Sequence, residues 1–317
     1  MNLDFFRHRP HPSFFLVQFR EAGRRIRLRP GLIYPRMTRL TPGDILDRKG
    51  GEKIAMVTAH DYLTARLAER GGADAVLVGD SLAMVALGHP DTLAVTMEEM
   101  LHHTRAVARG VERALLIGDM PFMSYQASVE EAVRNAGRFV KEGGAQAVKL
   151  EGGREYLPQI RAILKAGIPV MGHLGLLPQR AALESGFRVQ GRRAQDAREI
   201  IREAEELAAA GIFALVLECV PREVAALVTQ RVPCPVIGIG AGPDCDGQVL
   251  VLADLLGLYE RLKPRFVRQY AELGQAGAEA VARFVRDVRE GTFPGPEESY
   301  SMPREEKKAL HALLGME

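Results

Sequence analysis

The sequence predicts a single (β/α)₈ (TIM) barrel with an appended C-terminal helical segment. Three observations support this fold. Glycine-led buried strands recur along the chain, amphipathic helical stretches separate them, and the composition does not change from Ile54 to about Gly257. Short apolar runs of this kind suit strands covered on both faces, as in parallel sheets. Seven or eight strand–helix units without a break favour a closed barrel over a doubly wound sheet.

Seven strands are visible in the sequence. In three segments, glycines end a helix and a buried strand follows: residues 71–78, 143–150 and 211–217. Glycine accepts the left-handed geometry that commonly ends a helix. Four more apolar runs fit strands of the same kind: residues 54–58, 114–117, 170–171 and 236–239. An eighth strand is not evident after Gly257, where we expect an appended segment with a helix over residues 277–288.

The helices between the strands are also legible. Between residues 197 and 208, apolar side chains recur at three- and four-residue intervals, so one stripe packs against the sheet. Thr96 with Glu99, and Ser128 with Glu131, have the spacing of capping boxes. These pairs predict two helix starts that follow closely on strand ends.

Composition excludes several classes of protein. The 317 residues carry 42 basic and 40 acidic side chains, and a net charge of +2 gives no bulk field for nucleic acid or anionic lipid. The three cysteines, Cys219, Cys234 and Cys245, form neither a disulfide framework nor a CxxC zinc pair. No apolar run of about 18 residues is present to span a bilayer. We therefore expect a cytoplasmic protein that acts on a small molecule.

The first 36 residues differ from the rest, because they carry eight Arg but only two acids, Asp4 and Glu21. Their apolar patch, residues 14–19, is too short for a signal peptide and lacks a cleavage site of small residues. Met37 begins the stretch that leads into the first strand. We therefore interpret residues 1–36 as a disordered extension or a mis-assigned start, with a basic interaction arm as the alternative. The barrel domain then comprises residues 37–317.

Ionisable residues follow five consecutive predicted strands: Asp80 with Ser81 after it, Asp119, Lys149 with Glu151, His173, and Glu218. In a barrel the carboxyl ends of the strands converge on one mouth, so these side chains would share a pocket. Several carboxylates in one pocket repel one another unless a cation neutralises them. An oxygen-only ligand set without cysteine suits a hard ion such as Mg²⁺.

Each of these residues also has a purely structural interpretation. Asp80 or Asp119 would make a suitable N-cap for the next helix. Lys149 and Glu151 lie two apart and share one face of their strand, so they also fit an interior salt bridge. His173 also fits a hydrogen-bonded core histidine. The residues taken singly leave these alternatives open, although the joint pattern favours the pocket.

The stretch Gly238–Gly242 resembles a dinucleotide-binding loop only superficially. Its pattern is GxGxG rather than GxGxxG, and Pro243 follows where a helix should open. We reject a Rossmann site and expect a backbone-lined loop at the barrel mouth.

Eight ordered blocks run between about Ile54 and Pro294. They are VGDSL at 78–82, LAVT at 93–96, DMPFM at 119–123, VKLEGG at 148–153, GHLGL at 172–176, VQG at 189–191, LECVP at 217–221 and GIGAG at 238–242. In order and spacing these blocks resemble the signatures of the ketopantoate hydroxymethyltransferase family, which belongs to the phosphoenolpyruvate/pyruvate superfamily of barrels.

The resemblance implies transfer of a hydroxymethyl group from 5,10-methylenetetrahydrofolate to α-ketoisovalerate (3-methyl-2-oxobutanoate), giving 2-dehydropantoate for pantothenate synthesis. It implies one Mg²⁺ per subunit at Asp80, Asp119 and Glu151. The substrate-binding residues it implies are Asp80, Ser81, Asp119, Lys149 and His173. Glu218 is our candidate for the base that removes the C3 proton. Family members form large homo-oligomers, often decamers.

The chain departs from the family pattern at four positions: Ala253 and Glu298 stand where histidines are expected, Leu177 where threonine is, and Ser185 where glycine is. These departures bear on folate affinity and subunit contacts more than on chemistry. The rival interpretations are another Mg²⁺-dependent keto-acid lyase or mutase, and a non-catalytic oligomeric homologue. The sequence lacks the Lys-Lys-Cys-Gly-His-like loop of the superfamily's lyases, and its intact acids argue against lost catalysis.

Overall fold

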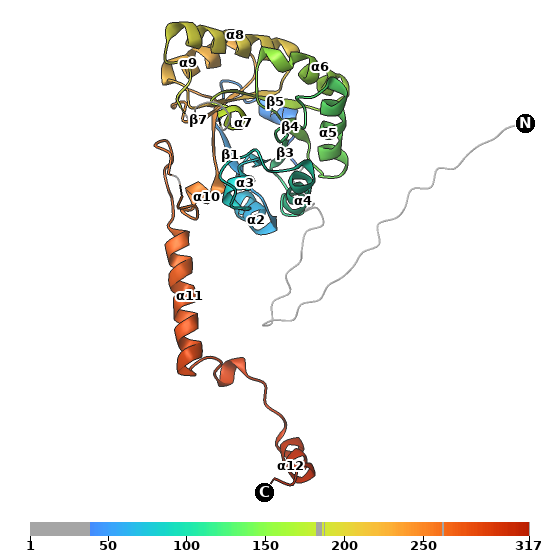
Figure 1. Cartoon of the computed structure of the whole chain (residues 1–317), viewed down its shortest axis with the longest axis vertical. Helices are drawn as coiled ribbons and strands as arrows, with labels where there is room; N and C mark the ends of the chain where they lie inside the picture. The colour runs from blue at the N-terminus through green and yellow to red at the C-terminus, as the bar shows by residue number, and fades with distance from the viewer. Residues whose placement is uncertain (1–38, 182–185, 187, 262, 317) are drawn as a thin grey trace, which may run out of the picture. The chain divides into compact units, whose positions relative to one another are not determined.

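A closed barrel of eight parallel strands forms the centre of the protein (Figure 1). The computed structural model describes residues 39–181, 186, 188–261 and 263–316. The strands are β1 (Ile54–Thr58), β2 (Ala75–Val78), β3 (Leu115–Asp119), β4 (Ala147–Lys149), β5 (Val170–Gly175), β6 (Ala214–Glu218), β7 (Val236–Ile239) and β8 (Gly247–Leu250). The predicted TIM barrel is confirmed. Our interpretation of residues 1–36 lies outside the described residues, as does Ser185.

Alternate residues of each strand enter two different apolar cores. In β3, Leu115 and Ile117 pack inside the barrel together with Met171 of β5, whereas Leu116 packs between the strands and the outer helices. Both faces of the strands are therefore covered, which explains why the strands read as continuous apolar runs. Because side chains fill the interior, a ligand of the barrel binds at its mouth rather than inside it.

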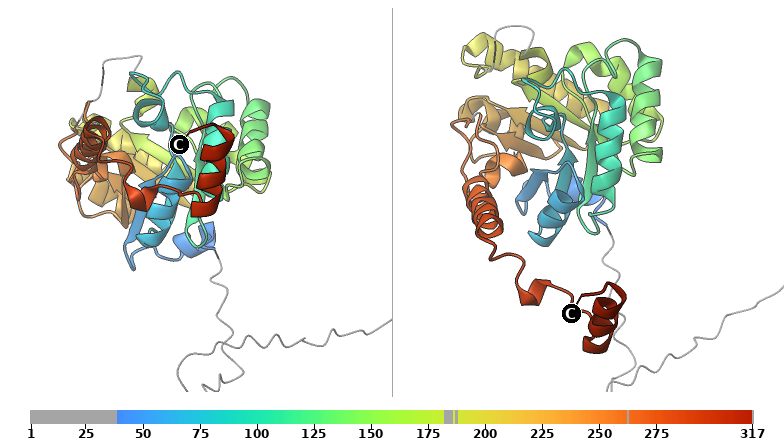
Figure 2. Two further views of the ribbon diagram at one scale, coloured as in Figure 1. Left: turned by 90° about the horizontal axis from the view of Figure 1, so that it is seen from below. Right: turned by 60° about the horizontal axis from the view of Figure 1, so that its bottom comes forward.

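Helices surround the strands (Figure 2). Asp61, Thr96 and Ser128 accept backbone hydrogen bonds at three helix starts, and Thr96 with Glu99 forms the predicted capping box. The helices are α1 (Pro42–Leu46), α2 (Tyr62–Arg70), α3 (Leu82–Val85), α4 (Met97–Ala108), α5 (Val129–Lys141), α6 (Leu157–Lys165), α7 (Pro178–Ala181), α8 (Ala194–Ala210), α9 (Arg222–Arg231), α10 (Leu252–Leu255), α11 (Leu273–Glu290) and α12 (Arg304–Leu313), with 3₁₀ turns η1 (Arg154–Tyr156) and η2 (Pro296–Glu298).

The eighth strand, β8, lies before Gly257, earlier in the chain than the region in which the sequence analysis left it undetected. Only the seven residues 240–246 separate β7 from β8, and they contain no helix. The strand–helix alternation that reveals the other strands therefore fails here. Only a glycine fits at Gly247, because a Cβ atom there would lie 2.5 Å from the Ile54 carbonyl oxygen. Gly238–Gly242 therefore leads into a strand and not into the helix with which a dinucleotide-binding unit opens.

The predicted C-terminal helical segment is present. Its main helix, α11, is longer than expected and ends at Gly291, whose φ of 71° is left-handed. Neither α11 nor α12 contains a buried residue. Val281, Phe284 and Val288 are exposed apolar side chains at helical spacing on α11. Across the described ranges, no helix combines the length and the apolarity that crossing a bilayer requires.

Candidate active site

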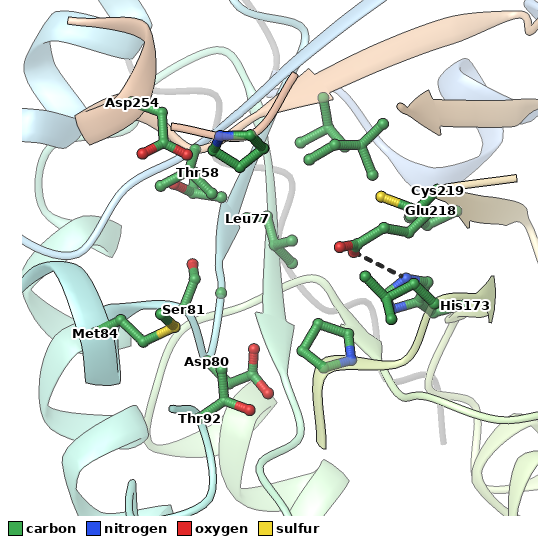
Figure 3. Close-up of a pocket in the computed structure, with 18 of the residues that line it drawn as sticks. Thr58, Leu77, Asp80, Ser81, Met84, Thr92, His173, Glu218, Cys219 and Asp254 are labelled. Atoms are coloured by element: carbon green, nitrogen blue, oxygen red, sulfur yellow. Dashed lines mark ion pairs between the residues drawn. The ribbon is translucent and has the colours of Figure 1, made fainter. Parts of the chain in front are cut away.

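All seven residues that the sequence placed at strand ends line one cavity of about 410 Å³ at the mouth of the barrel. Figure 3 shows Asp80 and Ser81 on one side of this pocket and His173 with Glu218 on another. The seven are Asp80, Ser81, Asp119, Lys149, Glu151, His173 and Glu218. The structure therefore brings the predicted set together.

Asp80 and Asp119 lie side by side and cap no helix. The Asp80 N–H donates to Asp119 Oδ2 at 3.1 Å, and both side chains are buried, with 4% and 1% of their surface exposed. The N-cap of α3 is Ser81, and that of α5 is Ser128. The N-cap interpretation of both aspartates is therefore wrong, and their carboxylates are available to the pocket.

Lys149 neutralises part of this acidic cluster. Its Nζ lies 2.7 Å from Asp119 Oδ1, which has no other partner, and 3.3 Å from His173 Nδ1. The ion pair is with Asp119 rather than with Glu151, because the β3–β4 register places Asp119 beside Lys149. Burial alone would lower the pKa of Lys149, but Asp119, Glu151 and Asp80 together raise it, so the ammonium form is favoured.

The carboxylates are more numerous than the cations available to them. Burial and the neighbouring Asp80 raise the pKa of Asp119 to about 7, although Lys149 opposes the shift. Burial, and then Asp80, also raise the pKa of Glu151 well above its ordinary value. Glu151 Oε2 accepts the Gln179 N–H at 3.1 Å, but Glu151 Oε1 is buried without a hydrogen-bond partner. The cluster therefore has spare acceptor oxygens and unrelieved negative charge.

His173 and Glu218 face each other across the pocket wall. Burial, followed by the charge of Lys149, lowers the pKa of His173 well below its ordinary value, so the ring is neutral. Lys149 has no acceptor, so His173 Nδ1 must accept from it and Nε2 carries the ring hydrogen. This Nε2 lies 3.3 Å from Glu218 Oε2. Burial raises the pKa of Glu218 to about 7.

The alternation of β6 turns Glu218 to the same side as Ala214 and Val216, and an unusual backbone conformation follows directly after it. Cys219 has a φ of 47°, in the left-handed region that favours glycine. Its N–H donates to the Ile239 carbonyl at 2.9 Å, and its own carbonyl accepts the Gln190 N–H at 2.9 Å. The chain therefore turns sharply after β6, at a point held from both sides, and Glu218 enters the pocket.

Gln179 is a site residue that the sequence did not reveal. Its Nε2 donates to Asp80 Oδ2 at 2.9 Å and to the Met120 carbonyl at 3.1 Å. Its Oε1 lies 3.0 Å from the Tyr125 hydroxyl, which in turn accepts the Glu151 N–H at 3.2 Å. Gln179 thus holds the side chain of Asp80 and, through its own N–H, that of Glu151. The only signal in the sequence was its position shortly after β5.

The donor chemistry of the cluster fits a hard divalent cation. No group of three or more His, Cys, Asp or Glu side chains in the described part of the chain is already arranged to hold a metal ion. However, Asp80, Asp119 and Glu151 are all buried carboxylates, and Glu151 Oε1 has no hydrogen-bond partner. A divalent cation would relieve the repulsion that raises the pKa of Asp119 and of Glu151. Oxygen-only donors are the ligands that Mg²⁺ prefers.

Comparison with known proteins places this site in context. A sequence model of the family described as ketopantoate hydroxymethyltransferase matches residues 39–296. The 3-methyl-2-oxobutanoate hydroxymethyltransferase of Syntrophobacter fumaroxidans is 58% identical over 275 residues, which are 87% of this chain and 98% of that protein. The protein of the same name from Moorella thermoacetica is 57% identical over 253 residues, which are 80% of this chain and 94% of that protein.

Solved structures support the fold. A phosphonopyruvate hydrolase in complex with oxalate and Mg²⁺ aligns with a TM-score of 0.55 and 18% identity over 87% of this chain and 95% of that chain. A phosphoenolpyruvate phosphomutase from Streptomyces platensis subsp. rosaceus aligns with a TM-score of 0.53 and 19% identity over 87% and 96% of the two chains. At these identities the likeness shows a common barrel and nothing about activity.

Proposed function

Because the chain belongs to the ketopantoate hydroxymethyltransferase family, we propose that it transfers a hydroxymethyl group from 5,10-methylenetetrahydrofolate to α-ketoisovalerate. The observation that carries this proposal is the meeting of a carboxylate cluster, a buried lysine and a separate carboxylate, Glu218, in one pocket. These are the groups needed to bind a keto acid and to remove a proton beside its carbonyl.

Asp80, Asp119 and Glu151 would hold one Mg²⁺ ion. Their buried oxygens, the unpartnered Glu151 Oε1 and the unrelieved charge of the cluster support this assignment. When bound, the ion supplies Lewis-acid stabilisation of the negative charge that develops on the oxygens of the keto acid.

Lys149 and Ser81 bind the substrate in this proposal. The Lys149 ammonium is fixed between Asp119 and His173 and attracts the carboxylate of the keto acid. Ser81 is the N-cap residue of α3, but its hydroxyl makes no capping hydrogen bond and lines the pocket, so it can donate to the substrate. Together these groups orient C3 of the keto acid toward Glu218.

Glu218 is the base. It takes the proton from C3, and the electron pair of that bond forms the enolate, whose carbon makes the new C–C bond to the one-carbon unit. Both bonds between that unit and the folate nitrogens break, and those nitrogens receive one proton from Glu218 and one from water. Water supplies the hydroxyl oxygen and tetrahydrofolate is released. Burial raises the pKa of Glu218 to about 7, which suits a base that works near neutral pH. The neutral His173 ring lies beside the Glu218 carboxylate, with its Nε2 3.3 Å from Glu218 Oε2.

We also propose that the protein is a cytoplasmic homo-oligomer, a decamer as in other members of the family. The three cysteines are free, as expected in a reducing compartment. Val281, Phe284 and Val288 give α11 an exposed apolar face that a second copy would cover. Light scattering on the purified protein tests the assembly, and a monomeric mass at micromolar concentration contradicts it.

Product analysis tests the proposed function. We expect 2-dehydropantoate from α-ketoisovalerate only when both methylenetetrahydrofolate and Mg²⁺ are present. Exchange of the C3 hydrogen with D₂O, followed by NMR, should require Mg²⁺ but not folate. Full turnover in EDTA, or product without a folate donor, would contradict the proposal.

A further inference from the structure

The pocket extends well beyond the carboxylate cluster. A volume of about 410 Å³ lies in the range of about 300–1,000 Å³ that holds drug-sized ligands, and a five-carbon keto acid leaves much of it open. The remaining walls are largely apolar and include Val251, Pro264 and Phe266. Arg188 and Arg265, both exposed, line the same cavity. This outer part of the pocket matches a flat ring system with an anionic tail.

One carboxylate in this outer part has no polar partner. Asp254 lies on α10, just after β8, and Leu252 N–H donates to Thr58 Oγ1 at 3.1 Å, which ties the start of α10 to the end of β1. The Asp254 side chain is half-buried, and within the described residues its carboxylate makes neither a hydrogen bond nor an ion pair. Burial raises its pKa to about 6. A carboxylate that loses water without gaining donors favours a ligand that supplies them.

The position of Asp254 is suited to such a ligand. Figure 3 shows Asp254, Glu218 and Asp80 on three sides of the pocket, with Leu77 between them. A ring held by Asp254 would therefore lie over the keto acid and beside the base. A folate whose ring lay there would present its one-carbon unit toward C3.

We propose that Asp254 binds the 2-amino-4-oxopyrimidine ring of the folate donor, accepting its ring N–H and its amino group in two parallel hydrogen bonds. The ring packs against the apolar wall at Phe266 and Pro264. The glutamyl carboxylates of the folate face Arg188 and Arg265. This inference rests on the proposed function, because it assigns a subsite to the cosubstrate of that reaction.

The substitution Asp254→Asn tests the inference. It keeps the size of the side chain but turns one acceptor into a donor that opposes the donors of the pyrimidine. We expect the KM for methylenetetrahydrofolate to rise about 10–100-fold, the loss typical of a charge-assisted hydrogen bond. Folate-independent C3 exchange should stay within about twofold of the unsubstituted protein. Asp244→Asn is the matched control, because Asp244 is exposed, pairs with Arg222 and does not line the pocket.

A second measurement uses a methylenetetrahydrofolate analogue that lacks the 2-amino group. Its KM should be raised with the unsubstituted protein, and Asp254→Asn should raise it by a smaller factor than it raises the KM of methylenetetrahydrofolate, because one of the two hydrogen bonds is already absent. An unchanged folate KM in Asp254→Asn would overturn the inference and leave the proposed function intact. If C3 exchange falls by as large a factor as the folate KM rises, Asp254 supports the fold rather than the folate ring, and the inference is overturned. Absence of product from the unsubstituted protein would overturn both proposals.

Discussion

Buried carboxylates lie at both ends of the barrel, but they differ in how completely their oxygens are satisfied. At the amino end, Asp246 is 5% exposed and accepts three hydrogen bonds, from Lys49 Nζ at 2.8 Å, Gly50 N–H at 3.0 Å and Val236 N–H at 2.8 Å. At the mouth, Asp119 and its neighbours share one lysine, and Glu151 Oε1 has no hydrogen-bond partner.

The difference teaches how to separate structural from functional acids. Burial is equal at the two ends, so burial alone identifies neither. Asp246 ties the segment before β1 to the starts of β7 and β8, and each bond it accepts stabilises the fold. The mouth acids are held by fewer donors than they can use, which destabilises the folded state unless a ligand supplies the rest. Substitutions at the two ends should therefore have opposite consequences.

The largest effect is expected at the mouth. Asp119→Asn keeps the shape of the side chain and can still accept the Asp80 N–H, but it removes a charge that the metal site needs. We expect kcat for 2-dehydropantoate formation to fall by about 10³-fold or more, because a Lewis-acid metal supplies several kcal/mol. Circular dichroism should show an unchanged fold. Wild-type turnover in this variant would place the metal elsewhere.

Glu218→Gln separates binding from chemistry. The variant should still bind Mg²⁺ and α-ketoisovalerate, measured by calorimetry, because Glu218 lies apart from the carboxylate cluster. Exchange of the C3 hydrogen with D₂O should fall by about 10²-fold or more, the usual contribution of a positioned base. Exchange at the wild-type rate would transfer the role of base to Lys149, His173 or a metal-bound hydroxide.

Gln179→Leu removes the amide that holds Asp80 and retains an apolar side chain of similar size. Metal affinity should fall about 10–100-fold, as is typical when a partner of a metal ligand is lost. Binding of Mn²⁺ followed by electron paramagnetic resonance measures this directly. Gln126→Leu is the control, because Gln126 contacts Gln179 Oε1 at 3.3 Å but touches no carboxylate of the cluster. If Gln126→Leu lowered the metal affinity as much as Gln179→Leu, the loss would come from altered packing and not from the released Asp80.

Asp246→Asn should have the smallest effect on catalysis and a clear effect on stability. Asn retains one acceptor oxygen but turns an NH₂ group toward a donor. We expect the free energy of unfolding to fall by about 2–3 kcal/mol, the cost of losing hydrogen bonds to a charged group. Denaturant unfolding measures the loss, and kcat at 25 °C should stay within about twofold. A lower kcat with an unchanged free energy of unfolding would contradict the distinction between the acids at the two ends of the barrel.

Residue type and spacing were sufficient to predict seven of the eight strands and the acids at the strand ends. Strands that are buried on both faces produce continuous apolar runs in the sequence, and the geometry of a barrel brings the carboxyl ends of its strands together. The sequence could not reveal register across strands, which is why Lys149 pairs with Asp119 rather than with Glu151. Gln179 was not predicted because an uncharged side chain on the short helix α7 carries no local signal. β8 was missed because no helix precedes it.

The left-handed conformation of Cys219 marks a place where selection for stability and selection for activity conflict. A residue with a Cβ atom in this region costs about 1–2 kcal/mol relative to an ordinary conformation. Glycine would relieve part of that cost but would also loosen the turn. Screens for heat-resistant versions of this chain should therefore favour Cys219→Gly. The same substitution should hold the Glu218 carboxylate less firmly in the pocket. Thermal stability and turnover are thus expected to oppose each other at a single residue, directly after the proposed base Glu218.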